Sequence, residues 1–158
     1  MEKLLSRKEQ WKHLLMFFVC LMSVNQIHAQ YYHFQADNDG KTIYYTARGT
    51  SATVVYGDVK YSGTINIPST VAYDGQTFSV VAIGSFAFND CADLDNVVLP
   101  TSLLSIGDYA FSGCTSLASM VVPNSVTAIG SNAFDGCTNL ISVTLSSSLK
   151  SIEYNTFN

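Results

Sequence analysis

Reactive and charged side chains are scarce in this sequence. Charged residues make up 13% of its 158 positions, histidine occurs three times, and eight Lys and Arg stand against twelve Asp and Glu. A net charge of −4 argues against nucleic acid as a partner, because binding to phosphates needs a basic surface. With so few candidate bases and nucleophiles, we expect no enzyme and no cofactor. The cysteines form no closely spaced pair, so we expect no zinc site.

The sequence also lacks an apolar run long enough to span a membrane. The longest, residues 14–22, is shorter than the roughly 20 residues of a spanning helix. It follows the basic residues 1–13 and precedes Ile27-His28-Ala29, which is typical of a signal-peptidase site. We therefore expect residues 1–29 to be a cleaved signal peptide. The mature protein is then secreted or on the cell surface, with no membrane insertion.

Cleavage would make the chain still poorer in reactive groups. It removes four of the eight basic residues and two of the twelve acidic ones, so the remainder is more acidic. His33 becomes the single histidine. Because it lies among aromatic residues, we expect it to be a packed residue and not a catalyst.

A period of 23 residues dominates the second half of the chain. Ile-Gly recurs at Ile83-Gly84, Ile106-Gly107 and Ile129-Gly130, and Ile152 falls on the same beat. The other recurring residues are Ala87, Ala110 and Ala133; Phe88, Phe111 and Phe134; Cys91, Cys114 and Cys137; Leu94, Leu117 and Leu140; and Ser102, Ser125 and Ser148. A strict period of this length predicts a solenoid, in which each repeat is one coil stacked on the last.

The order of residues within one repeat indicates the path of the coil. The segment 94–99 alternates at its end and predicts the parallel strand of the coil. Phe88 and its equivalents are expected to stack as the spine of the core. Cys91 and its equivalents share one position, where a disulfide would be strained and would leave one cysteine over. We therefore prefer a ladder of buried free thiols.

Residues 30–60 do not follow the period, and their aromatic, β-prone segments predict a β cap over the first coil. The segment Asp37-Asn38-Asp39-Gly40 is typical of a hairpin turn. A calcium loop starting at Asp37 would need a glutamate where Arg48 stands, so a turn is the better interpretation.

Residues 61–82 predict an irregular first coil, and 83–158 are the repeats. An insertion in the first coil surrounds residues 72–77, where Asp74-Gly75 predicts a small protruding hairpin. The last coil is incomplete and has drifted from the pattern. We expect either a longer protein, which we favour, or a partner that covers the open coil.

The pattern Ile-Gly-x-x-Ala-Phe-x-x-Cys-x-x-Leu, followed by an apolar strand and Ser, resembles the BspA-like leucine-rich repeat. The resemblance covers 83–151 closely and 61–82 loosely. It implies a mostly β, right-handed leucine-rich-repeat solenoid of 23-residue coils, and an exported protein that adheres to host matrix proteins or to other microbes. Where common leucine-rich repeats carry an Asn or Cys ladder, this chain has Ser102, Ser125 and Ser148. We hypothesise that these hydroxyls bond backbone groups of adjacent coils.

Since every ladder points inward, function is expected on the outward positions of the strand face. These positions are uncharged and cannot do acid–base chemistry, but they suit recognition of a protein ligand. The candidate binding residues are Thr64, Asn96, Ser119 and Ser142 in one row, Asn66, Val98, Val121 and Thr144 in the next, and Tyr73 on the inserted loop.

Other interpretations remain open. The strand face is an ordinary solvated β face if the coils serve only as a structural spacer or as part of a larger surface protein. End-to-end self-association through the open last coil would fit that interpretation. Glycan binding ranks lower, because the strand face has no aromatic residue and only Tyr73, Phe78 and Tyr109 are candidates nearby. For Asp90, Asp93 and Asp95, we prefer a solvated acidic edge as the interpretation over a weak calcium site.

Overall fold

The computed structural model describes residues 31–158, and all regular elements in that range are β-strands. The prediction of a mostly β chain is therefore confirmed. Within the described range, no helix has the length and apolar character needed to cross a membrane. The predicted signal peptide lies outside the described residues.

The N-terminal segment forms a β-hairpin joined by a two-residue turn. Strand β1 (Tyr31–Asn38) pairs antiparallel with β2 (Lys41–Arg48). The turn residues Asp39 and Gly40 have φ of 54° and 76°, and this pair of left-handed residues suits the twist of a hairpin. The Asp37 carboxylate accepts a hydrogen bond from the Gly40 amide at 3.1 Å. The predicted turn is confirmed.

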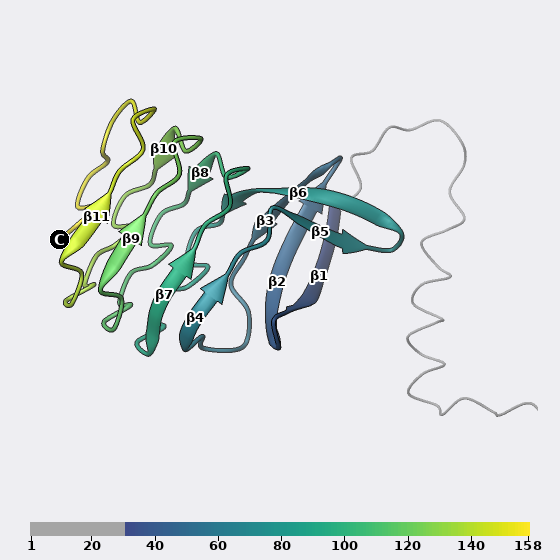
Figure 1. The fold of residues 1–158 in the computed structure, drawn as a ribbon, viewed down its shortest axis with the longest axis horizontal. Helices are drawn as coiled ribbons and strands as arrows, with labels where there is room; N and C mark the ends of the chain where they lie inside the picture. The colour runs from purple at the N-terminus through teal and green to yellow at the C-terminus, as the bar shows by residue number, and fades with distance from the viewer. Residues whose placement is uncertain (1–30) are drawn as a thin grey trace, which may run out of the picture.

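A seven-stranded sheet joins this hairpin to the coils (Figure 1). Strand β3 (Ser51–Val54) pairs antiparallel with β2 and parallel with β6 (Gln76–Ile83). The sheet continues through β8 (Ser105–Ile106) and β10 (Ala128–Ile129).

The predicted inserted hairpin is also present. Strand β5 (Thr70–Tyr73) pairs antiparallel with β6 across Asp74 and Gly75, whose φ angles are 50° and 71°. It does not simply protrude, because Tyr73 on β5 packs on the N-terminal hairpin through Phe34 and Tyr32.

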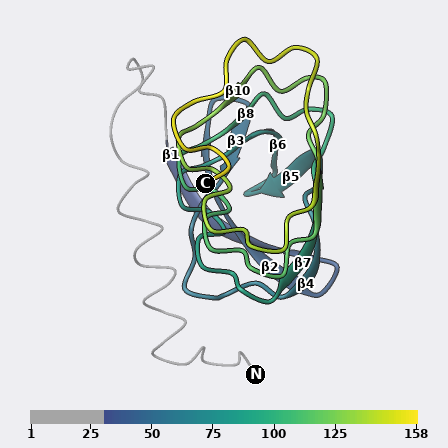
Figure 2. The same ribbon diagram turned by 90° about the vertical axis from the view of Figure 1, so that its left-hand side faces the viewer.

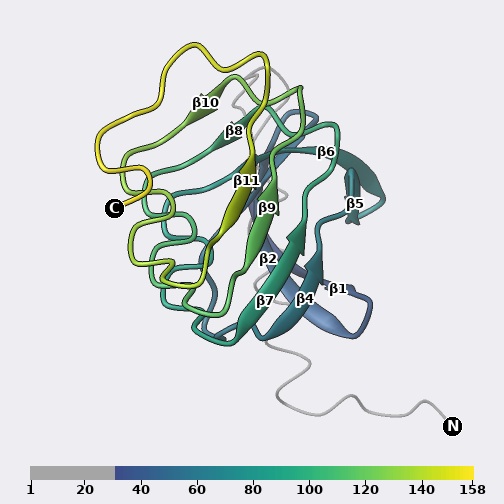
Figure 3. The ribbon, with the colours of Figure 1, turned by 60° about the vertical axis from the view of Figure 1, so that its left-hand side comes forward.

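The second group of strands lies across the core from the seven-stranded sheet. Strand β4 (Gly63–Asn66) pairs parallel with β7 (Leu94–Val98), and β9 (Ser119–Val121) pairs parallel with β11 (Ser142–Thr144). Figure 3 shows these four strands side by side along one face. Each regular coil thus contributes two strands, where the sequence analysis predicted one. The short β8 and β10 were missed because two residues show no periodicity.

Neighbouring coils repeat the same path, as Figure 2 shows along the stack. The parallel pairs Ile106–Ile129 and Met120–Val143 each join residues 23 positions apart. Gly107 illustrates how close the coils lie, since a Cβ there would be 2.6 Å from the Ser85 amide nitrogen of the previous coil. The glycine at this repeat position therefore permits a close backbone contact between adjacent coils.

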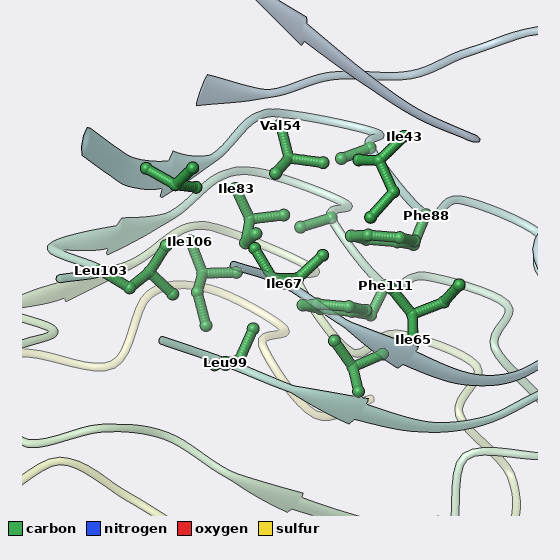
Figure 4. Close-up of a cluster of buried hydrophobic side chains, with 14 of the residues drawn as sticks. Ile43, Val54, Ile65, Ile67, Ile83, Phe88, Leu99, Leu103, Ile106 and Phe111 are labelled. Atoms are coloured by element: carbon green, nitrogen blue, oxygen red, sulfur yellow. The ribbon is translucent and has the colours of Figure 1, made fainter. Parts of the chain in front are cut away.

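Identical side chains stack in the core between the two groups of strands (Figure 4). The buried rings of Phe88, Phe111 and Phe134 are parallel, with centroids 5.2 and 5.3 Å apart. The isoleucines Ile83, Ile106 and Ile129 are also buried, whereas Ile152 is 54% exposed. The 23-residue period therefore extends to Ile152 in the sequence, but the side chain of Ile152 is not buried like those of the other three isoleucines.

The cysteine ladder consists of free, buried thiols, as predicted. The Cys114 thiol donates to the Phe88 carbonyl at 3.1 Å, and the Cys137 thiol donates to the Phe111 carbonyl at 3.1 Å. Burial raises the pKa of Cys137 to about 11 and also raises the pKa of Cys91 and Cys114. The thiols therefore stay protonated near neutral pH and act as small core residues.

The serine hypothesis holds at only one of its three positions. The Ser102 hydroxyl donates to the Val80 carbonyl of the adjacent coil at 2.7 Å. The Ser125 hydroxyl is buried without a hydrogen-bond partner among residues 31–158. In the last coil Ser146, and not the exposed Ser148, donates to the Val126 carbonyl at 2.6 Å. The hypothesis is wrong for Ser125 and Ser148, because a shared position does not ensure that a rotatable hydroxyl meets a carbonyl.

Candidate functional site

The strand face carries the two predicted rows of side chains. Strand pairing aligns Thr64 with Asn96 and Ser119 with Ser142 in one row, and Asn66 with Val98 and Val121 with Thr144 in the other. All eight side chains are exposed except Asn96, which is half-buried. Because side chains alternate along a strand, the intervening Ile65, Val97 and Met120 are buried.

An apolar pair lies in the middle of this face. Val98 is 50% exposed and Val121 is 64% exposed, and the next residues of their row are polar, Asn66 on one side and Thr144 on the other. An apolar centre with a polar rim is the usual anatomy of a protein–protein contact. The eight residues of the rows include no titratable side chain, so the rows themselves supply no acid or base.

The first coil of this face is bound to the N-terminal hairpin. The Asn66 amide nitrogen donates to the Asp39 carboxylate at 3.2 Å, and the Asn38 amide nitrogen donates to the Asn66 carbonyl. The Lys41 ammonium donates to the Thr64 carbonyl at 2.9 Å. The turn of the hairpin therefore borders one end of the strand face and holds Asn66 in place.

Tyr73 does not join the strand face, although it was grouped with that face as a candidate. It lies on β5 in the seven-stranded sheet, where its ring stacks on Phe34 at 4.4 Å and meets the edge of Tyr32 at 6.0 Å. The prediction placed it on a protruding loop. Burial of aromatic surface against the N-terminal hairpin explains its actual position.

Phe78 and His33 also differ from what the sequence predicted. Phe78 is fully buried, so it is not available to a ligand. His33, expected to be packed, is exposed on β1. Strand alternation is the reason, since the buried neighbour Phe34 takes the inward position.

His33 lines a pocket that no sequence motif predicted. It lies on the part of the seven-stranded sheet formed by β1, β2 and β3, which we call the N-terminal sheet, and has a volume of about 400 Å³. Its lining residues are His33, Phe34, Gln35, Tyr44, Tyr45, Val55 and Tyr56. The available signal was the aromatic richness of both hairpin strands, but only their pairing brings Gln35 opposite Tyr44.

A stacked aromatic pair, the exposed Phe86 and the half-buried Tyr109, lies at the turns that begin the first two regular coils. The rings of Phe86 and Tyr109 stack at 5.0 Å, and both residues have positive φ, 61° and 54°. Asn132 and Asn155 occupy the equivalent left-handed position in the following coils. The position is therefore a feature of the repeat. Asparagine tolerates the left-handed conformation better than the two aromatic residues do.

No group of three or more His, Cys, Asp or Glu side chains within residues 31–158 has the spacing of a metal site. Asp90, Asp93 and Asp95 are all exposed. The Asp90 carboxylate accepts a hydrogen bond from the neighbouring Asn89 amide at 2.8 Å.

Comparison with known proteins identifies the repeats. Residues 81–158 match the family model of the BspA type leucine rich repeat region. The pneumococcal vaccine antigen PcpA is 20% identical with a TM-score of 0.51, over 75% of this chain and 39% of that chain. No curated protein matches the chain.

Two other solved structures are similar at lower TM-scores. A leucine-rich repeat protein from Bacteroides capillosus ATCC 29799 is 24% identical with a TM-score of 0.46, over 63% of this chain and 92% of that chain. A leucine rich cell surface protein from Faecalibacterium prausnitzii A2-165 is 19% identical with a TM-score of 0.45, over 78% of this chain and 46% of that chain. The chain thus spans less than half the length of the pneumococcal and Faecalibacterium proteins.

The 23-residue pairing of the coils, the stacked phenylalanines and the family match all concern the same residues. Residues 81–158 therefore belong to the BspA type of leucine-rich repeat, which identifies this chain as a leucine-rich-repeat protein.

Proposed function

We propose that this chain is an exported recognition module that binds a protein through its strand face. The observation that carries the proposal is the exposed pair Val98 and Val121, whose neighbours in the two rows are small, uncharged side chains. A protein ligand can bury such a pair without leaving an unpaired charge in the interface. The ligand class that fits is a host matrix protein or a protein on another microbe.

We also propose an organisation for the whole chain. Residues 1–29 are a signal peptide, so the module acts outside the cell, either secreted or on the cell surface. The coils form a right-handed solenoid, and the sheet of residues 30–60 caps its first coil. The contacts that support this cap are the parallel pairing of β3 with β6 and the hydrogen bond from the Gly84 amide to the Val54 carbonyl at 2.7 Å.

The test is a substitution at the centre of the face. The purified chain is assayed on a panel of immobilised extracellular matrix proteins, with Val121→Asp as the variant. Ala128→Asp is the matched control, because Ala128 is an exposed residue of the same coil on β10 in the other sheet. We expect Val121→Asp to lose binding while its circular dichroism is unchanged, and Ala128→Asp to keep binding. Equal binding by both variants would contradict the proposal.

The alternative is a structural spacer whose coils associate end to end. It is favoured by one observation, the apolar surface of the last coil, where Ile141 is 89% exposed and Tyr154 is 77% exposed. Sedimentation of the chain and of Ile141→Glu distinguishes the two functions. Under the spacer function the chain forms concentration-dependent oligomers that Ile141→Glu dissociates, and Val121→Asp has no effect on any readout.

A further inference from the structure

We propose that the pocket on the N-terminal sheet binds a short, neutral carbohydrate. This site is separate from the strand face and takes a different class of ligand. Its seven lining residues come from β1, β2 and the segment that follows β3.

Strand register places the pocket on the side of the hairpin that faces away from the core. Tyr44 pairs with Gln35, while the adjacent pair Phe34 and Tyr45 is buried and stacked at 5.6 Å on the opposite side. Strand alternation therefore directs His33, Gln35 and Tyr44 outward together. Polar and aromatic side chains are gathered there by the backbone of a regular sheet.

Backbone and side-chain contacts hold the two outer tyrosine rings of the pocket. Gly57 is buried under Tyr44, and a Cβ at Gly57 would lie 2.0 Å from a carbon of that ring. Only glycine leaves room for the ring in this position. Tyr56 has the Lys60 ammonium 5.5 Å from its ring centroid, within the range of a cation–π contact. Lys60 is itself held by a hydrogen bond to the Asn89 carbonyl at 2.6 Å. A pocket whose walls are already in place binds a ligand at a smaller entropic cost.

The chemistry of the lining selects the ligand. No Asp, Glu, Lys or Arg lines the pocket, and the nearby Lys60 ammonium is already bound to the Asn89 carbonyl and the Tyr56 ring, so the lining favours a neutral ligand. Tyr44 and Tyr56 offer rings to the apolar C–H face of a sugar, and His33 and Gln35 offer donors and acceptors to its hydroxyls. The volume of about 400 Å³ falls in the range of small-molecule sites, roughly 300–1,000 Å³.

A proline-rich peptide also stacks on aromatic side chains, but it docks along an extended groove. Here the lining is confined to seven residues around one pocket.

The test is saturation-transfer NMR on the purified chain with lactose, cellobiose and N,N′-diacetylchitobiose at millimolar concentration. Gln35→Ala is the main variant, because Gln35 is exposed on β1 and contributes no side chain to the core; its circular dichroism should match that of the parent chain. Tyr31→Ala is the control, since Tyr31 is a 63% exposed aromatic residue of the same strand outside the pocket lining. The sugar binding of Tyr44→Ala is compared with that of the parent chain only if the circular dichroism spectra of the two match.

We expect at least one of the three sugars to show transfer, with about tenfold weaker binding in Gln35→Ala, the effect of one lost hydrogen bond. Tyr31→Ala and Val121→Asp should bind like the parent, which separates this site from the proposed strand-face function. Absence of transfer from all three sugars would overturn the proposal, as would equal binding by Gln35→Ala. Transfer from glucuronic acid alone, or from a proline-rich peptide alone, would overturn the ligand class.

Discussion

The N-terminal sheet and the regular coils bury aromatic rings in two different ways. In the coils, Phe88, Phe111 and Phe134 stack in parallel on copies of themselves. In the N-terminal sheet, the Phe34 ring meets Tyr45, Tyr73 and Phe78 at interplanar angles from 11° to 38°. A repeat gives each residue the same neighbour one coil away, whereas the sheet brings together residues with no common pattern. The packing of the coil rings therefore follows from the sequence, whereas the aromatic contacts of the N-terminal sheet do not.

The largest expected effect is loss of a ring from the middle of the ladder. Phe111→Ala removes a fully buried side chain that stacks on a ring on each side, and should cost about 3–5 kcal/mol of unfolding free energy. Phe34→Ala should cost less, because Phe34 is 8% exposed at the edge of its cluster. Urea unfolding followed by circular dichroism measures both, and an equal loss would show that the two regions pack equivalently.

A methyl group between coils should have the next largest effect. In Gly107→Ala the new Cβ would lie 2.6 Å from a backbone nitrogen of the adjacent coil, so the coils must separate, at about 2–3 kcal/mol. In Gly40→Ala, in the N-terminal turn, the new Cβ would have no atom within 4 Å. The loss of unfolding free energy then comes only from placing alanine at a φ of 76°, and should be about 1 kcal/mol. The same unfolding experiment ranks the two variants. The reverse order would mean that the coil contact relaxes freely.

Alkaline pH should weaken the coils before the N-terminal sheet. Burial raises the pKa of Cys137 from 9.0 to about 11, and that of Tyr61 from 10.0 to about 12. Burial also raises the pKa of Cys114 and Tyr45. The folded groups keep their protons while the unfolded ones lose them, so stability is complete below pH 9 and falls as the pH rises. Loss of stability through the thiols begins near pH 9, and loss through the phenols begins near pH 10. By pH 10, Cys137 alone lowers the unfolding free energy by about 1 kcal/mol.

Urea midpoints between pH 8 and 10.5 measure this loss of stability. Replacing Cys91, Cys114 and Cys137 together by Ala should remove the part that begins at pH 9 and leave the part that begins at pH 10. A parent chain whose midpoint is constant up to pH 10.5 would refute the assignment.

The smallest effect compares two serines at the same repeat position. Ser102→Ala removes the hydrogen bond to the Val80 carbonyl at 2.7 Å, and should cost about 1 kcal/mol. Ser125→Ala removes a buried hydroxyl without a partner in the described range, so it should be neutral or stabilising. Thermal melts of the two variants give the comparison. A loss at Ser125 as large as that at Ser102 would restore the serine-ladder hypothesis.

The sequence predicted the candidate face well and the pocket not at all. The eight row residues of the face follow from alternation and a 23-residue period, and strand pairing aligns them as expected. Tyr73 was misplaced because its partner Phe34 lies far away in the chain. The pocket was missed for a related reason. His33 and Tyr56 come together only when β1, β2 and β3 pair, and no local pattern records that pairing.

By itself, the sequence determined the period, the buried ladders and the free thiols, because each depends on a residue and its copy one coil away. The hairpin turns at Asp39-Gly40 and Asp74-Gly75 were equally local, since their left-handed residues suit few other structures. Only the tertiary structure decided that the inserted hairpin packs on the N-terminal sheet, that Ser146 replaces Ser148 as a donor, and that His33 faces outward at a pocket. These outcomes depend on side-chain contacts between segments that share no repeat, and such contacts follow from packing in three dimensions.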